Sequence, residues 1–100
     1  MTLVPSSKIC GAPVTARDGT ALGSITDFMV DHATGELNYA VMSHGGLLGV
    51  GEKLFAVPWR AFTVDPVAHT LSLDTTAERL SSVQGINKDA WPADASDWRA

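Results

Sequence analysis

The chain has 100 residues, of which 45% are hydrophobic and 18% are charged, and its formal net charge is -4. This length accommodates one domain, and the ordinary apolar content argues against disorder. The acidic balance leaves no basic stripe to neutralise phosphates, so we expect no nucleic-acid partner. The single cysteine, Cys10, excludes an internal disulfide and a cysteine-based zinc site.

The apolar stretches are short. Asp, Ser, Gly or His interrupts them every few residues, so none approaches the ~20 apolar residues that a membrane-spanning helix needs. The start of the sequence, residues 1–8, lacks the basic-then-apolar layout of a secretory signal. We therefore expect a cytoplasmic protein that does not insert directly into a membrane.

Short runs rich in Val, Ile, Leu, Phe and Thr, separated by turn signals, predict an all-β fold. Ile25 and Phe28 are three residues apart, which breaks the alternation of a strand and predicts a bulge near Asp27. Pro58 cannot donate to a sheet ladder and should close its strand. The expected strands cover residues 13–16, 22–32, 37–43, 53–57, 62–64 and 70–73.

The third expected strand alternates cleanly, which assigns its residues to two faces of the sheet. One face should carry Leu37, Tyr39 and Val41, and the other Asn38, Ala40 and Met42.

A short helix should follow the last strand. Thr75 and Glu78 have the spacing of a capping box, and Ala77, Leu80 and Val83 give a brief helical stripe that ends near Gly85. Residues 1–85 are expected to form one domain, and residues 86–100 a tail. Six short strands must hide their edges, so we expect a small, partly open antiparallel barrel of five or six strands.

Four glycines in seven residues, Gly45 to Gly51, suggest a phosphate-binding loop, but their order and context do not fit one. The dinucleotide fingerprint lies between a strand and a helix, whereas this loop precedes a strand. A nucleotide-triphosphate loop needs contiguous Gly-Lys-Ser/Thr, whereas Glu52 separates Gly51 from Lys53. We therefore expect no nucleotide and no other cofactor.

Six motifs in order give the sequence a family resemblance over about residues 8–74. They are Gly11-x-Pro-Val14, Asp18-Gly-x-x-Leu-Gly23, Ile25-x-Asp27-x-x-x-Asp31-x-x-Thr-Gly35, Tyr39-Ala-Val41, Gly45-Gly-Leu-Leu-Gly-Val-Gly51 and Ala56-Val-Pro-Trp59. The chain thereby resembles the PRC-barrel family, named for the barrel of the H subunit of the photosynthetic reaction centre. Its tail, Gly85-Ile-x-x-x-x-Trp91-Pro92, resembles the end of small stand-alone bacterial members. The resemblance implies a partly open β-barrel that acts as a docking or scaffolding module, with no shared catalytic residues.

The residues that could carry chemistry also have structural interpretations. Asp27 and Asp31 would share one strand face and His32 the other, so a metal site would need a further ligand such as His44. Asp31 opens a turn, where Asp commonly accepts backbone N–H groups. Ser43 and His44 are adjacent and would point to opposite faces, which prevents a nucleophile–base pair. We predict no catalytic residue and no metal site.

The remaining candidates are one thiol and three indoles. Cys10 is expected to be a small buried hydrophobe between Ile9 and Gly11. Trp59 should seal one end of the barrel. Trp91 and Trp98 either fold back onto the barrel or bind a partner, because indoles contribute strongly to interfaces.

The sequence favours a non-enzymatic protein-interaction module that forms a homodimer and docks onto a partner protein. The expected interaction residues are Gly45, Gly46, Leu47, Leu48, Trp59, Trp91 and Trp98. One alternative is a small-molecule or metal-binding regulator that uses Asp31, His32 and His44. Another is an adaptor at a membrane complex, similar to the reaction-centre subunit.

Overall fold

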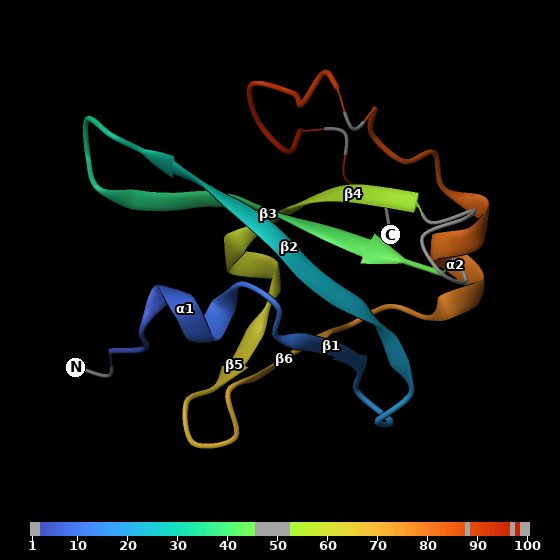
Figure 1. The fold of residues 1–100 in the computed structure, drawn as a ribbon. Coiled ribbons are helices and arrows are strands. Elements are labelled where there is room, and N and C mark those ends of the chain that lie inside the picture. The colour runs from blue at the N-terminus through green and yellow to red at the C-terminus, as the bar shows by residue number, and fades with distance from the viewer. Residues whose placement is uncertain (1–2, 46–52, 88, 97, 99–100) are drawn as a thin grey trace.

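The computed structural model describes residues 3–45, 53–87, 89–96 and 98. Within them six strands form one sheet in the order β4-β3-β2-β1-β6-β5, which curls into a partly open barrel (Figure 1). The elements are α1 (Ser6–Ile9), β1 (Pro13–Ala16), β2 (Ala21–Asp31), β3 (Glu36–His44), β4 (Lys53–Pro58), η1 (Trp59–Ala61), β5 (Thr63–Asp65), β6 (Thr70–Leu73) and α2 (Ala77–Ser82).

The all-β prediction is confirmed, and the six strands lie close to their expected positions. The single turn of helix α1 was not expected, because four residues are too few to show a helical period. Among the residues that the structure describes, no helix is long enough and apolar enough to cross a membrane.

One strand pairing differs from a series of antiparallel hairpins. β1 pairs with β6 in parallel, with Val14 opposite Leu71 and Ala16 opposite Leu73. The other pairings, β1–β2, β2–β3, β3–β4 and β5–β6, are antiparallel. β1 forms a hairpin with β2 on one side, and β6 returns much later in the chain to its other side. Such a contact between distant strands leaves no local sequence signal.

Two register shifts bend the long hairpin of β2 and β3. Ile25 faces Met42 and Asp27 faces Val41, so Thr26 is an extra residue on β2. The Thr26 hydroxyl donates to the carbonyl of Val41 at 3.1 Å. The predicted bulge near Asp27 is therefore confirmed.

The second shift changes the face on which Leu37 lies. Met29 faces Tyr39 and Val30 faces Leu37, which leaves Asn38 as an extra residue on β3. Because one inserted residue reverses the alternation, Leu37 packs against the barrel interior rather than beside Tyr39. The expectation that Leu37 shares a face with Tyr39 and Val41 was wrong for this reason.

The sheet is buried on both of its faces around β3. Ala40 and Met42 point into the barrel interior, whereas Tyr39 and Val41 point to the opposite face, as predicted for these four residues. The interior core is formed by Ile9, Ala12, Val14, Ala16, Leu22, Ile25, Ala40, Met42, Phe55, Val57, Phe62, Leu71, Leu73 and Leu80. We call the other group the outer cluster; it consists of Tyr39, Val41 and Ala56, packed against Leu54, Ile86, Trp91 and Ala95.

Helix α2 is capped one residue later than predicted. The hydroxyl of Thr76, not that of Thr75, accepts the backbone N–H of Arg79 at 3.2 Å. Thr75 is only 7% exposed, and its buried hydroxyl has no hydrogen-bond partner within the described part of the chain. Burial of Thr75 leaves the exposed Thr76 to cap the helix.

Gly23 permits a close approach between the backbones of β2 and β3, and its replacement should be strongly destabilising. A Cβ at Gly23 would lie 1.8 Å from the carbonyl oxygen of Ser43. We expect Gly23→Ala to lower the free energy of unfolding by about 3 kcal/mol, because the backbone of β3 must shift. Urea denaturation measures this change.

Gly19→Ala is the matched control for this substitution. Gly19 has a φ of 92°, with no atom within 4 Å of an added Cβ. Only backbone strain then applies, at a cost of about 1–2 kcal/mol. Equal losses in the two variants would contradict the steric role of Gly23.

Candidate functional site beneath the C-terminal strap

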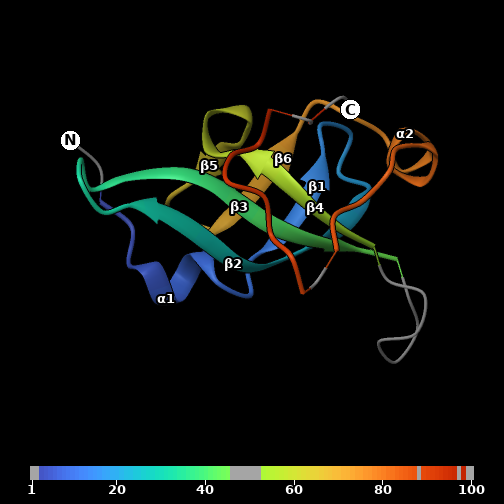
Figure 2. The same cartoon turned by 90° about the horizontal axis from the view of Figure 1, so that it is seen from above.

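Residues 83–87, 89–96 and 98 form an extended segment that we call the strap. After α2 it leaves the edge of the sheet and crosses the outer face of β3 and β4 (Figures 1 and 2). Trp91 and Ala95 belong to the outer cluster, whereas Trp98 packs against the interior core. The strap thus contacts both hydrophobic groups of the protein.

The start of the strap is fixed to β4 by backbone and side-chain hydrogen bonds. Lys53 donates from its ammonium group to the carbonyls of Ser81 and Val83, both at 2.9 Å. These carbonyls lie at the C-terminal end of α2, where a cation is favourable. The N–H of Ile86 then donates to the carbonyl of Leu54 at 2.7 Å, as an isolated antiparallel bridge.

Gly85 makes this close bridge possible. A Cβ at Gly85 would lie 2.6 Å from the carbonyl oxygen of Leu54. Since the clash would be with backbone, a side chain at this position would push the strap away from β4.

Two further contacts hold the far part of the strap. The hydroxyl of Tyr39, a residue that is 1% exposed, donates to the carbonyl of Pro92 at 2.6 Å. The ring of Trp98 meets that of Phe55 edge-on, with centroids 6.2 Å apart and an interplanar angle of 81°. Such edge-to-face pairs are favourable beyond their buried area.

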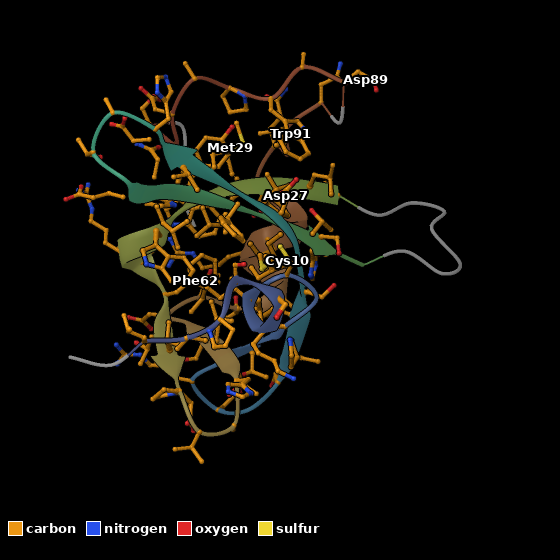
Figure 3. The ribbon with its side chains drawn as sticks, turned by 60° about the vertical axis from the view of Figure 1, so that its left-hand side comes forward. Cys10, Asp27, Met29, Phe62, Asp89 and Trp91 are labelled. Carbon is orange, nitrogen blue, oxygen red and sulfur yellow. The ribbon has the colours of Figure 1, made fainter. Side chains whose placement is uncertain are left out.

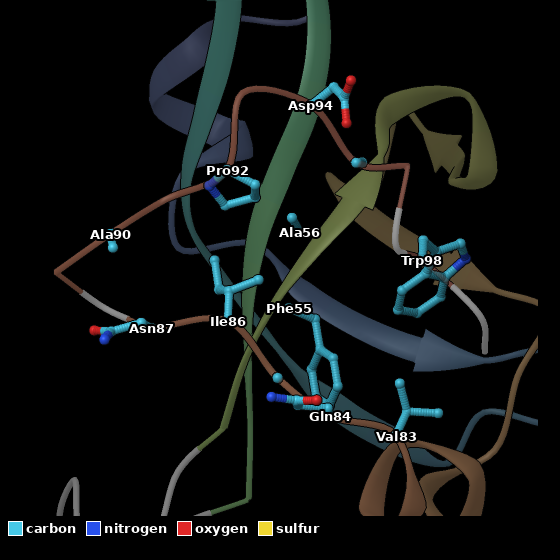
Figure 4. A pocket seen from close by; sticks show the side chains of 12 residues that line it. Phe55, Ala56, Val83, Gln84, Ile86, Asn87, Ala90, Pro92, Asp94 and Trp98 are labelled. Carbon is cyan, nitrogen blue, oxygen red and sulfur yellow. The ribbon is translucent and has the colours of Figure 1, made fainter.

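A cavity of about 560 Å³ lies between β4 and the strap (Figure 4). Among the described residues the strap pairs with β4 at Ile86 only, and it next contacts the sheet by hydrogen bond at Pro92, which accepts from Tyr39 on β3. The described residues that line it are Phe55, Ala56, Val83, Gln84, Gly85, Ile86, Asn87, Ala90, Pro92, Asp94, Ala95 and Trp98.

Asp94 stands between this cavity and a smaller one of about 300 Å³. Two hydrogen bonds from Ser96 lower the pKa of Asp94 below its ordinary value. The bond from the Ser96 hydroxyl has the larger effect, and the bond from the Ser96 backbone N–H the smaller. Arg60 lines the smaller cavity only. The larger cavity therefore has a carboxylate at its rim, and Asp94 is the one ionisable side chain among its described lining residues.

The three tryptophans expected to bind a partner all contact their own chain. Trp59 begins η1, packs against the interior core and lies 5.8 Å from the ring of Phe62, centroid to centroid. Trp91 packs in the outer cluster, and its indole N–H is buried without a hydrogen-bond partner among the described residues. Trp98 rests on Phe55. Contact of these rings with a partner stays a prediction.

The glycine-rich loop lies mostly outside the described residues. Gly45 directly follows β3, whereas Gly46, Leu47 and Leu48 fall beyond the described part of the chain.

The residues considered for a metal site have separate local roles. Asp31 accepts the N–H of Ala33 at 3.0 Å in the β2–β3 turn, as its turn interpretation predicts, and Asp27 accepts the N–H of Phe28 at 2.8 Å. A ring nitrogen of His44 contacts the carbonyl of Leu22. No group of three or more His, Cys, Asp or Glu that could hold a metal ion occurs among the residues described.

Ser43 and Cys10 also lie away from any catalytic arrangement. The Ser43 hydroxyl lies 3.4 Å from that of Ser24, in the β2–β3 ladder. Cys10 is exposed at the end of α1 (Figure 3), so the expectation of a buried cysteine was wrong. Its neighbour Ile9 takes the core position instead, because the helical turn points only one of the two side chains inward.

The cavity itself could not be read from the sequence. Its lining comes from β4 and from the strap, which are separated in the sequence by up to 43 positions, from Phe55 to Trp98. The available local signals are Gly85 before Ile86 and two tryptophans on an otherwise polar tail. These signals indicate that the tail approaches another segment closely and makes apolar contacts, but they do not indicate a cavity between the tail and the sheet.

Comparison with known proteins connects the sheet to one family. The family model of the PRC-barrel domain matches residues 1–80 of the 100-residue chain. No curated protein matches the chain. The matched region contains the whole sheet and ends within α2, so all of the cavity wall that the strap provides lies outside it.

Tyr39→Phe should loosen the strap. The substitution removes the hydrogen bond to Pro92 and keeps the ring in the outer cluster, so we expect the free energy of unfolding to fall by about 1 kcal/mol. Urea denaturation followed by tryptophan fluorescence measures the loss. An unchanged stability would contradict the anchoring role of this hydroxyl.

The same residue predicts a pH dependence. Burial, and to a lesser extent the negative charge of Asp94, raises the pKa of Tyr39 above its ordinary value of 10.0. Above about pH 10 the unfolded chain releases this proton while the folded chain retains it, so stability falls as pH rises. Urea midpoints from about pH 8 to about pH 11 should therefore decline more steeply in the wild type than in Tyr39→Phe.

Proposed function

The chain belongs to the PRC-barrel family, and from that premise we propose that it is a non-enzymatic protein-interaction module. It associates with a second copy of itself and docks onto a partner protein. The observation that carries this proposal is the projecting end of the β2–β3 hairpin, which presents two large apolar side chains to solvent.

The hairpin end extends beyond the strands on either side of it (Figure 1). β1 pairs with β2 only as far as Ser24, and β4 pairs with β3 only from Tyr39 onward. Residues 30–31 and 36–38 consequently form a two-stranded ribbon, and residues 27–29 lie at its base, on the edge of β2 where β3 is still paired with β4. A two-stranded ribbon gains stability when another surface covers it.

Met29, at the base of this ribbon, and Val30, within it, are exposed apolar residues, at 37% and 50% exposure. Met29 lies opposite Tyr39 and therefore on the outer face, the side on which Trp91 lies (Figure 3). Val30 lies opposite Leu37 and on the other face. Apolar side chains on both faces suit a partner that encloses the ribbon.

The mode of docking follows from the edge of β2. The bulge at Thr26 and the charged residues Asp27 and Asp31 interrupt this edge, and such features disfavour pairing with a further strand. We therefore propose that partners contact the side chains of the ribbon rather than add a strand to it.

The non-enzymatic part of the proposal is supported by the roles of the nearest candidate residues. Ser43 is paired with Ser24, and His44 contacts the Leu22 carbonyl and the ring of Phe55, so neither is oriented towards the other as nucleophile and base. A cytoplasmic location is also part of the proposal, and the exposed free thiol of Cys10 fits a reducing compartment.

Val30→Lys tests self-association and docking together. We expect this change to raise the dimer dissociation constant about tenfold or more, because a charge replaces an apolar contact. Sedimentation velocity over a concentration series measures the constant. Val67→Lys is the matched control, since Val67 is 87% exposed in the turn between β5 and β6, away from the ribbon.

Two outcomes would contradict the proposal. A wild-type chain that stays monomeric at every concentration would refute self-association. A partner that is captured from lysate equally by the wild type and by Val30→Lys would refute docking through the hairpin.

A further inference from the structure

We propose that the cavity beneath the strap binds a small organic amine with an apolar, ring-containing body. The body would lie against Phe55 and Trp98, and the ammonium group would lie at the rim beside Asp94. This inference concerns a different surface from the β2–β3 ribbon and does not depend on the proposed docking function.

The cavity is bounded by a segment that is anchored at several places. The strap that closes it is held by Lys53 at the end of α2, by Ile86 on Leu54 and by Tyr39 on Pro92. These anchors lie on successive parts of the strap, so the intervening segment cannot collapse onto β4 without losing one of them. Its volume of about 560 Å³ lies within the range of small-molecule sites.

The walls fit an apolar ring. Phe55 lies at the centre of the lining in Figure 4, with Ile86, Val83 and Trp98 around it. Phe55 and Trp98 already form an edge-to-face pair, a geometry to which a further ring can be added. An apolar ligand in this space would gain dispersion contacts with these side chains.

The rim selects the charge of the ligand. Asp94 is the ionisable group among the described lining residues, and the other polar side chains there are the neutral amides Gln84 and Asn87. A carboxylate has about four acceptor sites, of which Ser96 uses part, so capacity remains for an ammonium group. Asp94 is exposed, so an ammonium beside it keeps much of its hydration and gains a modest attraction.

An extended peptide fits the cavity less well. Leu54 already pairs with Ile86, and Pro58 has no N–H to donate, so the outer edge of β4 offers a strand only Ala56 between them. Backbone hydrogen bonds at one residue are too few to hold a peptide as an added strand, whereas a compact ligand does not need such bonds.

Three probes that share one ring system test the proposal by isothermal titration calorimetry. They are 1-naphthylmethylamine, 1-naphthylmethanol and 1-naphthoate, which differ in charge. We expect all binding to be saturable, with the amine about threefold tighter than the alcohol and the carboxylate weakest.

Two variants locate the binding. Ala90→Trp places a large side chain at an exposed lining position and should abolish binding of all three probes. Ala93→Trp is its matched control, because Ala93 is exposed on the same strap but does not line the cavity. Asp94→Asn should retain the alcohol and lose the preference for the amine, and its retained binding shows that the strap is still folded.

The proposal is overturned by any of four results: no probe binds the wild type; Ala93→Trp blocks binding as strongly as Ala90→Trp; the amine and the carboxylate bind equally; or an extended apolar peptide binds where the probes do not. If Ala90→Trp raises the thermal stability and the wild type binds no probe, the cavity is only a packing void beneath the strap.

Discussion

The burial of β3 on both faces is the constraint on which the rest of this structure depends. Four successive residues, Tyr39 to Met42, are each 1% exposed or less. In a small barrel one face of a strand packs inward and the other ordinarily meets water. Here Tyr39 and Val41 point outward, so something must cover them, and the strap does so with Ile86, Trp91 and Ala95.

This cover contributes to stability as well as to shape. Burial of a large apolar side chain is worth about 1.5–3 kcal/mol, a substantial share of the stability of a domain of this size. The outer cluster therefore makes the tail part of the folded unit. It also explains why Tyr39 is a tyrosine: its ring fills the cluster while its hydroxyl reaches the Pro92 carbonyl.

Much of the sheet could be predicted because its signals are local. Alternation placed Tyr39 and Ala40 on opposite faces, and the spacing of Ile25 and Phe28 predicted a bulge near Asp27, which the structure places at Thr26. Two predictions were wrong because adjacent residues were about equally suited to one position. Thr75 and Thr76 are equally able to cap a helix, and only burial of the first decides between them. Cys10 and Ile9 likewise compete for one core position.

What could not be predicted depends on contacts between distant segments. The parallel pairing of β1 with β6 joins Val14 to Leu71, and the second bulge moves Leu37 across the sheet, with no signal in either sequence neighbourhood. The cavity is of the same kind, because it arises where two well-packed contacts, at Ile86 and at Pro92, leave a gap between them. A sequence pattern indicates which side chains are buried, but it does not indicate where the packed segments leave a cavity.

The candidate site and the fold are coupled through Tyr39. Its ring faces Met29 across the β2–β3 pair, and its hydroxyl fixes the strap above the cavity. A substitution that removes both the ring and the hydroxyl of Tyr39 would therefore disturb the ribbon, the outer cluster and the cavity together, and a loss of binding in such a variant could not be assigned to one of them. Val30 and Ala90 are exposed residues on separate elements, so their replacement alters one surface at a time. The effects of distant, independent sites on stability are additive. The free energy of unfolding of a double variant at Val30 and Ala90 would therefore show whether the ribbon and the cavity are energetically independent.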